Sequence, residues 1–381
     1  MIKLTKNEIT YLASAFNNSS ALSIFKNIKG NPDGTEYKKL TEKGVIKANG
    51  YSPEALSILT LLSEPERCSR LFLQNTFAIV EKYTYRKGDR LILAENNDGE
   101  LVFSEPEDLF EVTTGLAEYV GASKIFRTMQ SVSADYNEMA VFLAAVDICR
   151  KRNLMSLAGS HSASSSGFSA ADIAEELSSA DPNGITVLFL KNYGLEAPSS
   201  DRIADLTSGL VKNGYLAKSA NGYRISDALQ KISDNFLVTE SVSFCELMTL
   251  SDKDELLFTG NLFVNAGLHD IISFYFDGDS AEMIPISAML MLEKIEEYMS
   301  CPVLGSSSAN HPPAPAPVPA PPPPQRAQHY SSPPPPVPSS PAPQKQTATS
   351  RVPADPGLWN CPSCGKQNKG NFCVECGTRK P

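Results

Sequence analysis

A dense run of prolines near the C-terminus divides this chain of 381 residues into a part that can fold and a part that cannot. The segment from Pro312 to Pro356 holds 18 of the 28 prolines. Proline lacks the backbone N–H donor, and the segment has little apolar surface to bury, so neither a helix nor a sheet is expected there. Residues 304–357 are therefore predicted to form a disordered or polyproline II linker. We interpret it as a spacer; the alternative is a docking track for proline-recognising domains.

Charge follows the same division of the chain. Residues 304–381 carry seven basic and two acidic side chains, whereas residues 1–303 carry 27 basic and 41 acidic ones, a net charge of −14. Such an acidic body repels phosphate backbones and anionic membrane surfaces. The body also lacks an apolar run of the roughly 18–20 residues that span a bilayer, and the N-terminal sequence is not that of a secretory signal. We expect a soluble cytoplasmic protein without membrane insertion.

Two Cys-x-x-Cys-Gly motifs lie in the last 24 residues, and they contain Cys361 with Cys364 and Cys373 with Cys376. Two intervening residues let a tight turn aim both thiolates at one ion, and four thiolates complete a tetrahedral shell around Zn²⁺. Because no coordination position stays open, we expect one structural Zn²⁺, which supplies most of the folding free energy of so short a segment. A redox-active cysteine pair is the alternative, but two motifs at this spacing favour zinc.

Residues 358–381 resemble the short bacterial zinc ribbon that ends many multidomain proteins. The resemblance rests on Trp359 before the first motif and Phe372 before the second, in the pattern W-x-C-x-x-C-G followed by F-C-x-x-C-G. It implies that the four cysteines are zinc ligands.

The body, residues 1–303, is predicted to be an internal repeat. Asn7–Phe16 matches Asn137–Val146 in its apolar pattern, and three further pairs of segments follow in the same order. These pairs are Lys43–Ser52 with Asn213–Ser226, the expected hairpin Arg90–Phe103 with Ile271–Ile284, and the helix ends Leu116–Val120 with Ile295–Met299. We therefore expect two units, residues 1–121 and 122–303, each with helices first and antiparallel strands afterwards.

The helical part of each unit reads as a winged helix, which is a helix-turn-helix followed by a β-ribbon. In the second unit, Ser200 is a candidate N-cap, and the helix that follows carries Ile203, Leu206, Leu210 and Val211 on one face. Gly214 should end this helix, and Tyr215–Ile225 should form the wing. Residues 159–167 form a Ser-rich insertion that reads as a flexible loop. The predicted fold class is α+β, a pseudo-twofold tandem repeat of winged helix plus antiparallel sheet.

This arrangement resembles the EspG-type chaperones of ESX, or type VII, secretion. The residues that carry the resemblance are the paired helices Asn7–Phe16 and Asn137–Val146 and the strand Gly88–Leu93 with its flanking helices. The resemblance implies a pseudo-twofold protein with a shared central sheet that binds secreted helical proteins. The proline-rich linker and the zinc ribbon are additions to that family pattern.

Winged helices also bind DNA, so a transcription regulator is the alternative function. The first predicted recognition helix carries Lys38, Lys39 and Lys43, with Lys47 just beyond it. The second carries Arg202 and Lys212 together with Asp201 and Asp205. Because DNA binding needs several phosphate contacts, the acidic body opposes nucleic-acid binding, and we do not expect a nucleic-acid partner.

Catalysis has little support in the sequence. There is no phosphate-binding loop and no nucleophile elbow. His161 beside Ser160 and Ser162 could form a nucleophile–base pair, but a flexible loop rarely holds that geometry. His269 reads as a turn residue, and His311 and His329 lie in or beside the linker. The hairpin residues Asp98, Asp277 and Asp279 could bind calcium but are explained by turn chemistry.

The four remaining cysteines are Cys68, Cys149, Cys245 and Cys301. They lie far apart in the sequence among apolar neighbours, so they are predicted to be reduced core residues rather than a disulfide framework. Taken together, the sequence predicts a non-enzymatic adaptor or chaperone. Its body would bind a protein client, and its tethered zinc ribbon would contact a second partner. The sequence leaves open the client, the involvement of a secretion system, the oligomeric state, and whether the two repeats share one sheet or form separate lobes.

Overall fold

The computed structural model divides the chain into two units, Met1–Val318 and Pro319–Pro381. It describes residues 1–16, 19–117, 130–159, 167–179, 181–267, 270–277, 279–303, 359–360 and 367–368. The predicted linker and most of the Ser-rich insertion therefore lie outside the described residues.

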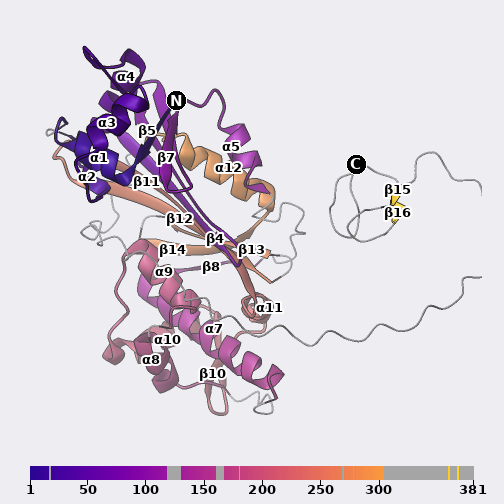
Figure 1. Cartoon of the computed structure of the whole chain (residues 1–381). Helices are drawn as coiled ribbons and strands as arrows, with labels where there is room; N and C mark the ends of the chain where they lie inside the picture. Colours follow the sequence, from indigo (N-terminus) through magenta and orange to yellow (C-terminus); the bar gives the residue numbers. More distant parts are fainter. Residues whose placement is uncertain are drawn as a thin grey trace, which may run out of the picture. The chain divides into compact units, whose positions relative to one another are not determined.

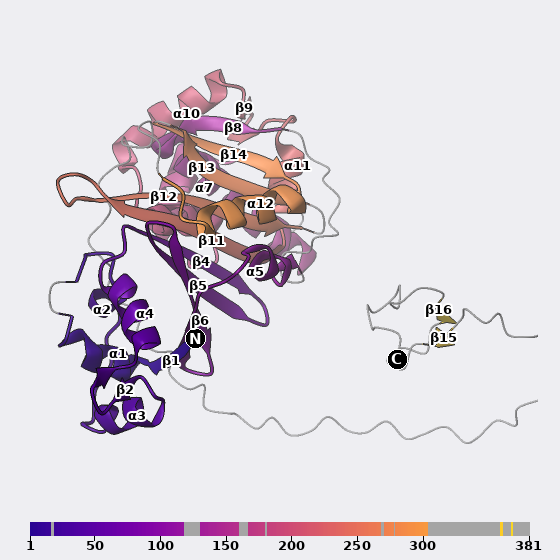
Figure 2. The same ribbon diagram turned by 90° about the horizontal axis from the view of Figure 1, so that it is seen from above.

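A ten-stranded antiparallel sheet forms the centre of the first unit (Figures 1 and 2). The first half of the chain contributes five strands: β1 (Ile2–Thr5), β4 (Arg67–Asn75), β5 (Ile79–Lys87), β6 (Arg90–Asn97) and β7 (Glu100–Ser104). The second half contributes β8 (Val132–Asp135), β11 (Thr239–Leu250), β12 (Leu256–Ala266), β13 (Asp270–Asp277) and β14 (Ser280–Ile286).

The order of these strands shows that both halves of the chain share one sheet. It runs β1-β7-β6-β5-β4-β11-β12-β13-β14-β8, so the halves meet where β4 pairs with β11. From the edge inward, the first half reads β1, β7, β6, β5 and β4, and the second half reads β8, β14, β13, β12 and β11. In each half the first strand is outermost and is followed by the fifth, fourth, third and second. The two predicted hairpins are confirmed as β6/β7 and β13/β14. The first turns at Asp98 and Gly99, whose φ angles of +50° and +88° suit a tight hairpin turn.

Helices between the strands form two lobes. The first lobe contains α1 (Lys6–Ala13), α2 (Ile24–Asn27), α3 (Glu36–Glu42), α4 (Pro53–Ser63) and the strand pair β2 (Ile46–Lys47) and β3 (Gly50–Tyr51). The second lobe contains the following elements: α7 (Tyr136–Leu157), α8 (Ala170–Ser179), α9 (Ile185–Tyr193), a 3-10 turn (Ser200–Arg202), α10 (Ile203–Lys212), β9 (Leu216–Ser219), β10 (Gly222–Ile225) and α11 (Gln230–Asn235).

The same local geometry ends the third helix of one lobe and α10 of the other. Gly44 follows α3 and Gly214 follows α10, with φ angles of +71° and +78° that favour glycine. The next residues, Val45 and Tyr215, each donate their backbone N–H to the carbonyl five residues back, at 2.9 Å in both lobes. Each helix is thereby closed and the chain turns into a two-stranded ribbon, as the sequence predicts.

The predicted face of α10 is confirmed, because Ile203, Leu206 and Leu210 are buried. The predicted cap is wrong. Ser200 begins the 3-10 turn that precedes α10, and Ser199 stands before that turn. A short 3-10 turn often begins a helix, and sequence alone does not distinguish it from the helix proper.

Both lobes pack on the same face of the sheet. Cys68 belongs to the core beneath the first lobe, and Phe244 belongs to the core beneath the second. Phe244 pairs with Phe72, which lies four residues after Cys68 on the same strand, so both cores occupy one face. The opposite face is covered by α12 (Ala288–Met299) beside α5 (Phe110–Thr114), which Figure 1 shows away from both lobes.

In the second unit, the structure describes one short pair of strands. β15 (Trp359–Asn360) pairs antiparallel with β16 (Gln367–Asn368). All four predicted zinc ligands, Cys361, Cys364, Cys373 and Cys376, lie outside the described residues.

Candidate protein-binding surface and metal site

An exposed apolar tip lies at one end of the central strands. It consists of Phe77 and Ile79, in and after the turn between β4 and β5, and Val238, just before β11. Their exposed fractions are 95%, 67% and 54%. Because Ser241 of β11 pairs with Asn75 of β4, Val238 lies beside this turn. Large apolar side chains that stay grouped on the surface contribute little hydrophobic stabilisation to the monomer, and such groups often mark an interaction site.

The turn that carries Phe77 is held by its own hydrogen bonds. The side-chain Oδ1 of Asn75 accepts the backbone N–H of Phe77 at 2.8 Å and that of Ala78 at 2.7 Å. The N–H of Asn75 donates to the carbonyl of Ala78 at 3.0 Å. An asparagine that satisfies its own turn in this way presents the following side chain in a defined position. The apolar tip is therefore a preformed feature of the β4/β5 hairpin.

A second feature, here termed the central patch, lies between the two lobes on the sheet face that both lobes occupy. It consists of Arg70 and Phe72 of β4, Glu81 and Tyr83 of β5, and Glu246 of β11. All five residues are half-buried, whereas Leu71 and Leu73 on the other face of β4 are fully covered by the core beneath α12. The sheet is thus sealed on one side and accessible at its centre on the other.

Arg70 organises the central patch. Its Nε donates to Oε1 of Glu81 at 2.8 Å, and its Nη1 donates to Oε1 of Glu246 at 3.2 Å. The hydroxyl of Tyr83 donates to the same Glu81 oxygen at 2.6 Å. The guanidinium carbon lies 5.7 Å from the centre of the Phe72 ring and 6.0 Å from that of Tyr83, within cation–π range.

Burial and the neighbouring charges shift the pKa values of Arg70 and Glu246 in opposite directions. Burial lowers the pKa of Arg70, but Glu246, Tyr83 and Glu81 outweigh this effect and raise it overall. Burial raises the pKa of Glu246, and Arg70 offsets only part of that increase. Burial also raises the pKa of Tyr83, so its hydroxyl stays protonated and remains a donor at neutral pH. The patch therefore holds two carboxylates and one guanidinium in a poorly solvated setting.

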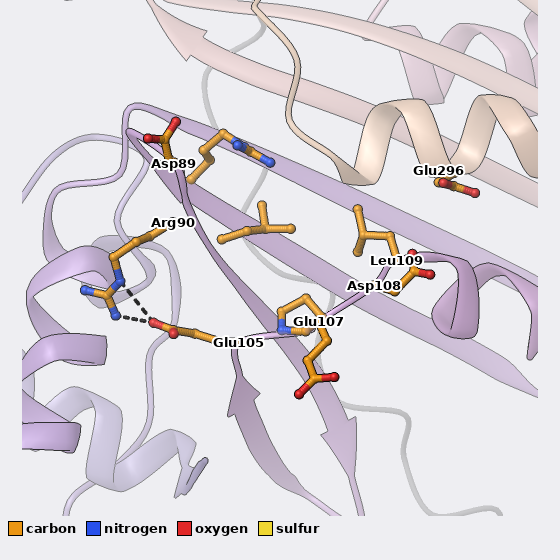
Figure 3. A pocket seen from close by; sticks show the side chains of 10 residues that line it. Asp89, Arg90, Glu105, Glu107, Asp108, Leu109 and Glu296 are labelled. Atoms are coloured by element: carbon orange, nitrogen blue, oxygen red, sulfur yellow. Dashed lines mark hydrogen bonds and ion pairs between the residues drawn. The ribbon is translucent and has the colours of Figure 1, made fainter.

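A polar pocket of about 440 Å³ is lined by residues of the β5/β6 hairpin, of the segment after β7 and of α12 (Figure 3). Its carboxylates are Asp89, Glu105, Glu107, Asp108 and Glu296. Figure 3 shows Arg90 turned toward Glu105, with which it forms an ion pair. The lining contains no cysteine, histidine or hydroxyl side chain.

The lysines of the predicted first recognition helix are mostly engaged with carboxylates. Lys43 contacts Glu8 and Glu100, both at 2.8 Å. Lys39 lies 3.4 Å from Asp33, and Lys38 lies 3.8 Å from Glu42. Three of the four cations proposed for phosphate contact are therefore already paired, which disfavours DNA binding at this helix.

The cysteines predicted for the core are found there. Cys68, Cys245 and Cys301 are buried and Cys149 is half-buried, and all four are free thiols. Burial raises the pKa of Cys149 and of Cys301 to about 11, so these thiols are protonated at neutral pH and poor nucleophiles.

The structure describes only some of the other candidate site residues. Asp98 sits in the β6/β7 turn and Asp277 ends β13, in keeping with turn chemistry. Ser160, His161, Ser162, His269, His311 and His329 all lie outside the described residues. Within the part of the chain that the structure describes, no group of three or more histidine, cysteine or acidic residues is placed to hold a metal ion.

No helix among the described residues has the length and apolarity needed to cross a bilayer. No protein-family model and no curated protein matches the chain. Among solved structures, the chain is similar to one from the complex of the Mycobacterium tuberculosis type VII secretion system chaperone EspG5 with the PE25–PPE41 dimer. The TM-score is 0.46 at 8% sequence identity, over 82% of this chain and 99% of that chain. The similarity is weak and concerns the arrangement of the elements alone.

Proposed function

We propose that this chain is a non-enzymatic cytoplasmic adaptor or chaperone, and that its body binds a protein client. The observation that carries the proposal is the apolar tip of Phe77, Ile79 and Val238. A phenylalanine that is 95% exposed in a hydrogen-bonded turn is explained by a partner that covers it. A secreted helical protein is the client class that the resemblance to EspG-type chaperones implies.

The test of client binding uses Phe77→Ser. Because Phe77 is 95% exposed, its replacement should leave the melting temperature unchanged while removing an anchor of the interface. Tagged wild type and Phe77→Ser are purified from the native organism, and the amount of co-purifying protein per chain is compared. The matched control is Leu157→Ser, which replaces another exposed apolar residue, at the end of α7.

We expect one stoichiometric partner with wild type and with Leu157→Ser, and at least about tenfold less with Phe77→Ser. The client proposal fails if wild type brings down no stable partner. The assignment of the tip fails if the same partner binds Phe77→Ser at the wild-type level.

We further propose that the body is a tandem repeat of winged-helix lobes. Three features support it. The strand order is the same in both halves. Each lobe places helices before a two-stranded ribbon, with three α-helices in the first lobe and four in the second. The glycine-ended helices Glu36–Glu42 and Ile203–Lys212 close in the same way. In this proposal the winged helices serve protein contacts, since the acidic body and the paired lysines disfavour nucleic acid.

We propose that the C-terminal tip is a zinc ribbon that contacts a second partner. Its ligands are Cys361, Cys364, Cys373 and Cys376, which together supply four thiolates and leave no open position on a structural Zn²⁺. The pairing of β15 with β16 supports a chain reversal around the first cysteine pair. A tethered tip raises the effective concentration of its partner near the client, provided the linker spans both sites.

Metal analysis tests the zinc proposal. Freshly purified protein should contain one zinc per chain, and Cys373→Ser should lose it, because a site with three thiolates binds much more weakly. The body cysteine variant Cys149→Ser is the control and should keep the metal. Zinc-free protein, or full zinc retention in Cys373→Ser, would remove this part of the proposal.

A further inference from the structure

The central patch has more negative than positive charge. Glu81 and Glu246 share the single cation Arg70, and both use only their Oε1 atom to bind it. Among the described residues, no donor reaches Oε2 of either carboxylate. The nearby cation Lys82 is not available, because it projects from the opposite face of β5 and pairs with Glu95. The patch therefore retains two carboxylate oxygens ready to accept hydrogen bonds.

The surroundings suit a long basic side chain. The side chains of Arg70, Glu81 and Glu246 are 35%, 33% and 17% exposed, so the cluster is reachable yet poorly solvated. Neither free oxygen belongs to the fully buried atoms that lack a partner, so each keeps some solvent-exposed surface. Phe72 and Tyr83 provide aromatic faces on which an aliphatic stem or a second cation can pack. An ion pair formed in such a setting is screened less than one on an open surface.

We propose that the client presents a lysine or arginine side chain that enters the central patch and binds Glu81 and Glu246 beside Arg70. This inference rests on the proposed client-binding function and adds the chemistry by which a client is selected. The added cation balances the second carboxylate, so the patch becomes neutral when the complex forms. A client with an acidic or neutral residue at that position leaves the excess charge uncompensated and binds less tightly.

The test uses a library of short leucine-rich helical peptides in which one central position is randomised. The full-length chain is immobilised, bound peptides are sequenced, and the enrichment of Lys and Arg over Gln at that position is measured. For wild type we expect an enrichment of about tenfold, in line with partly buried charge pairs at interfaces. Glu246→Gln should abolish it, whereas Glu95→Gln, on the other face of the sheet, should leave it unchanged.

Arg70→Gln separates recognition from structural support. This variant leaves two carboxylates without a cation, so the enrichment of Lys and Arg should rise above the wild-type level. If the patch had only a structural role, the enrichment of Lys and Arg would instead be lost in both Arg70→Gln and Glu246→Gln. Thermal unfolding of each variant confirms that the fold is retained, and Glu81→Gln replaces Glu246→Gln if the latter unfolds.

Two outcomes overturn the inference: absence of a basic preference in wild type, including absence of peptide binding, or the same preference in Glu246→Gln. Its failure is distinguishable from that of client binding itself. Phe77→Ser should weaken all peptides without changing their charge preference, whereas the patch variants should change the preference alone.

Discussion

At the scale of single residues, Lys43 joins two helices of the first lobe, α1 and α3, to strand β7 of the sheet. It follows α3, and its Nζ binds Glu8 of α1 and Glu100 of β7. Burial lowers the pKa of Lys43, but the two carboxylates outweigh it and raise the pKa overall. The Glu8 side chain is 1% exposed and also accepts the N–H of Thr5 in a capping box. Lys43 is thus better explained as a clamp than as a phosphate contact.

Replacing Lys43 by methionine should lower the free energy of unfolding by about 2 kcal/mol, because it leaves the buried Glu8 carboxylate without its cation. Lys38→Met is the control. Its partner Glu42 is exposed, so we expect a change within about 0.5 kcal/mol. Urea unfolding measures both. Equal effects of the two substitutions would contradict the clamp.

The difference in unfolding free energy between wild type and Lys43→Met should depend on pH. Hydrogen bonding and charge from Lys43 lower the pKa of Glu100 in the folded chain. Its contribution is therefore present above the pKa of an unfolded glutamate and is lost as the pH falls through the lowered value. The gap between wild type and Lys43→Met should accordingly shrink on acidification below about pH 4.

At the scale of elements, the outermost strand β8 is protected by a side chain from the second lobe. The hydroxyl of Tyr215 donates to the carbonyl of Ser133 at 2.9 Å and accepts the N–H of Ser133 at 3.1 Å. One phenol thus satisfies both backbone groups that an added strand would use. Edge strands left open pair with other chains, so this contact keeps the sheet from extending at β8.

Tyr215→Phe removes both hydrogen bonds while keeping the ring, which packs near Phe142. We expect a loss of about 1 kcal/mol of stability and faster hydrogen exchange of the Ser133 amide. Tyr37→Phe, at an exposed position in α3, serves as the control and should change neither quantity. Unchanged exchange at Ser133 in Tyr215→Phe would show that the hydroxyl does not protect the edge.

At the scale of the whole molecule, the two halves depend on each other. β4 pairs with β11 from Arg67 to Asn75, in the middle of the sheet, and α12 crosses this junction on the sealed face. A half taken alone would expose the edge of a long central strand and half of the core beneath α12. The two predicted units, residues 1–121 and 122–303, are therefore not expected to fold independently of each other.

The body should consequently unfold in a single transition. Far-UV circular dichroism and tyrosine fluorescence of the full chain should give coincident urea curves, since breaking the β4/β11 junction removes core from both halves. Residues 1–121 expressed alone should lack a cooperative transition. Two separated transitions, or a stably folded fragment, would show that the halves are autonomous.

The sequence predicted features that depend on neighbouring residues. The glycine-ended helices, the Asp98-Gly99 hairpin and the buried face of α10 follow from periodicity and turn chemistry, and the structure confirms them. It missed Phe77, whose only local signal is the Asn75-Thr76-Phe77 turn. It also missed the central patch, because Arg70 and Glu246 lie 176 positions apart and no local pattern relates them.

The predictions that the sequence supports are therefore local and compositional: a proline run expected to exclude a core, four cysteines expected to bind one metal ion, and segment pairs expected to form a repeat. The tertiary structure decided the rest. It joined the two halves through β4 and β11. It left Phe77 exposed and the central patch partly open between the lobes. It also paired three of the lysines that favour a DNA-binding interpretation with carboxylates. These outcomes depend on contacts between distant residues, and the energies of such contacts exist only once the sheet has assembled.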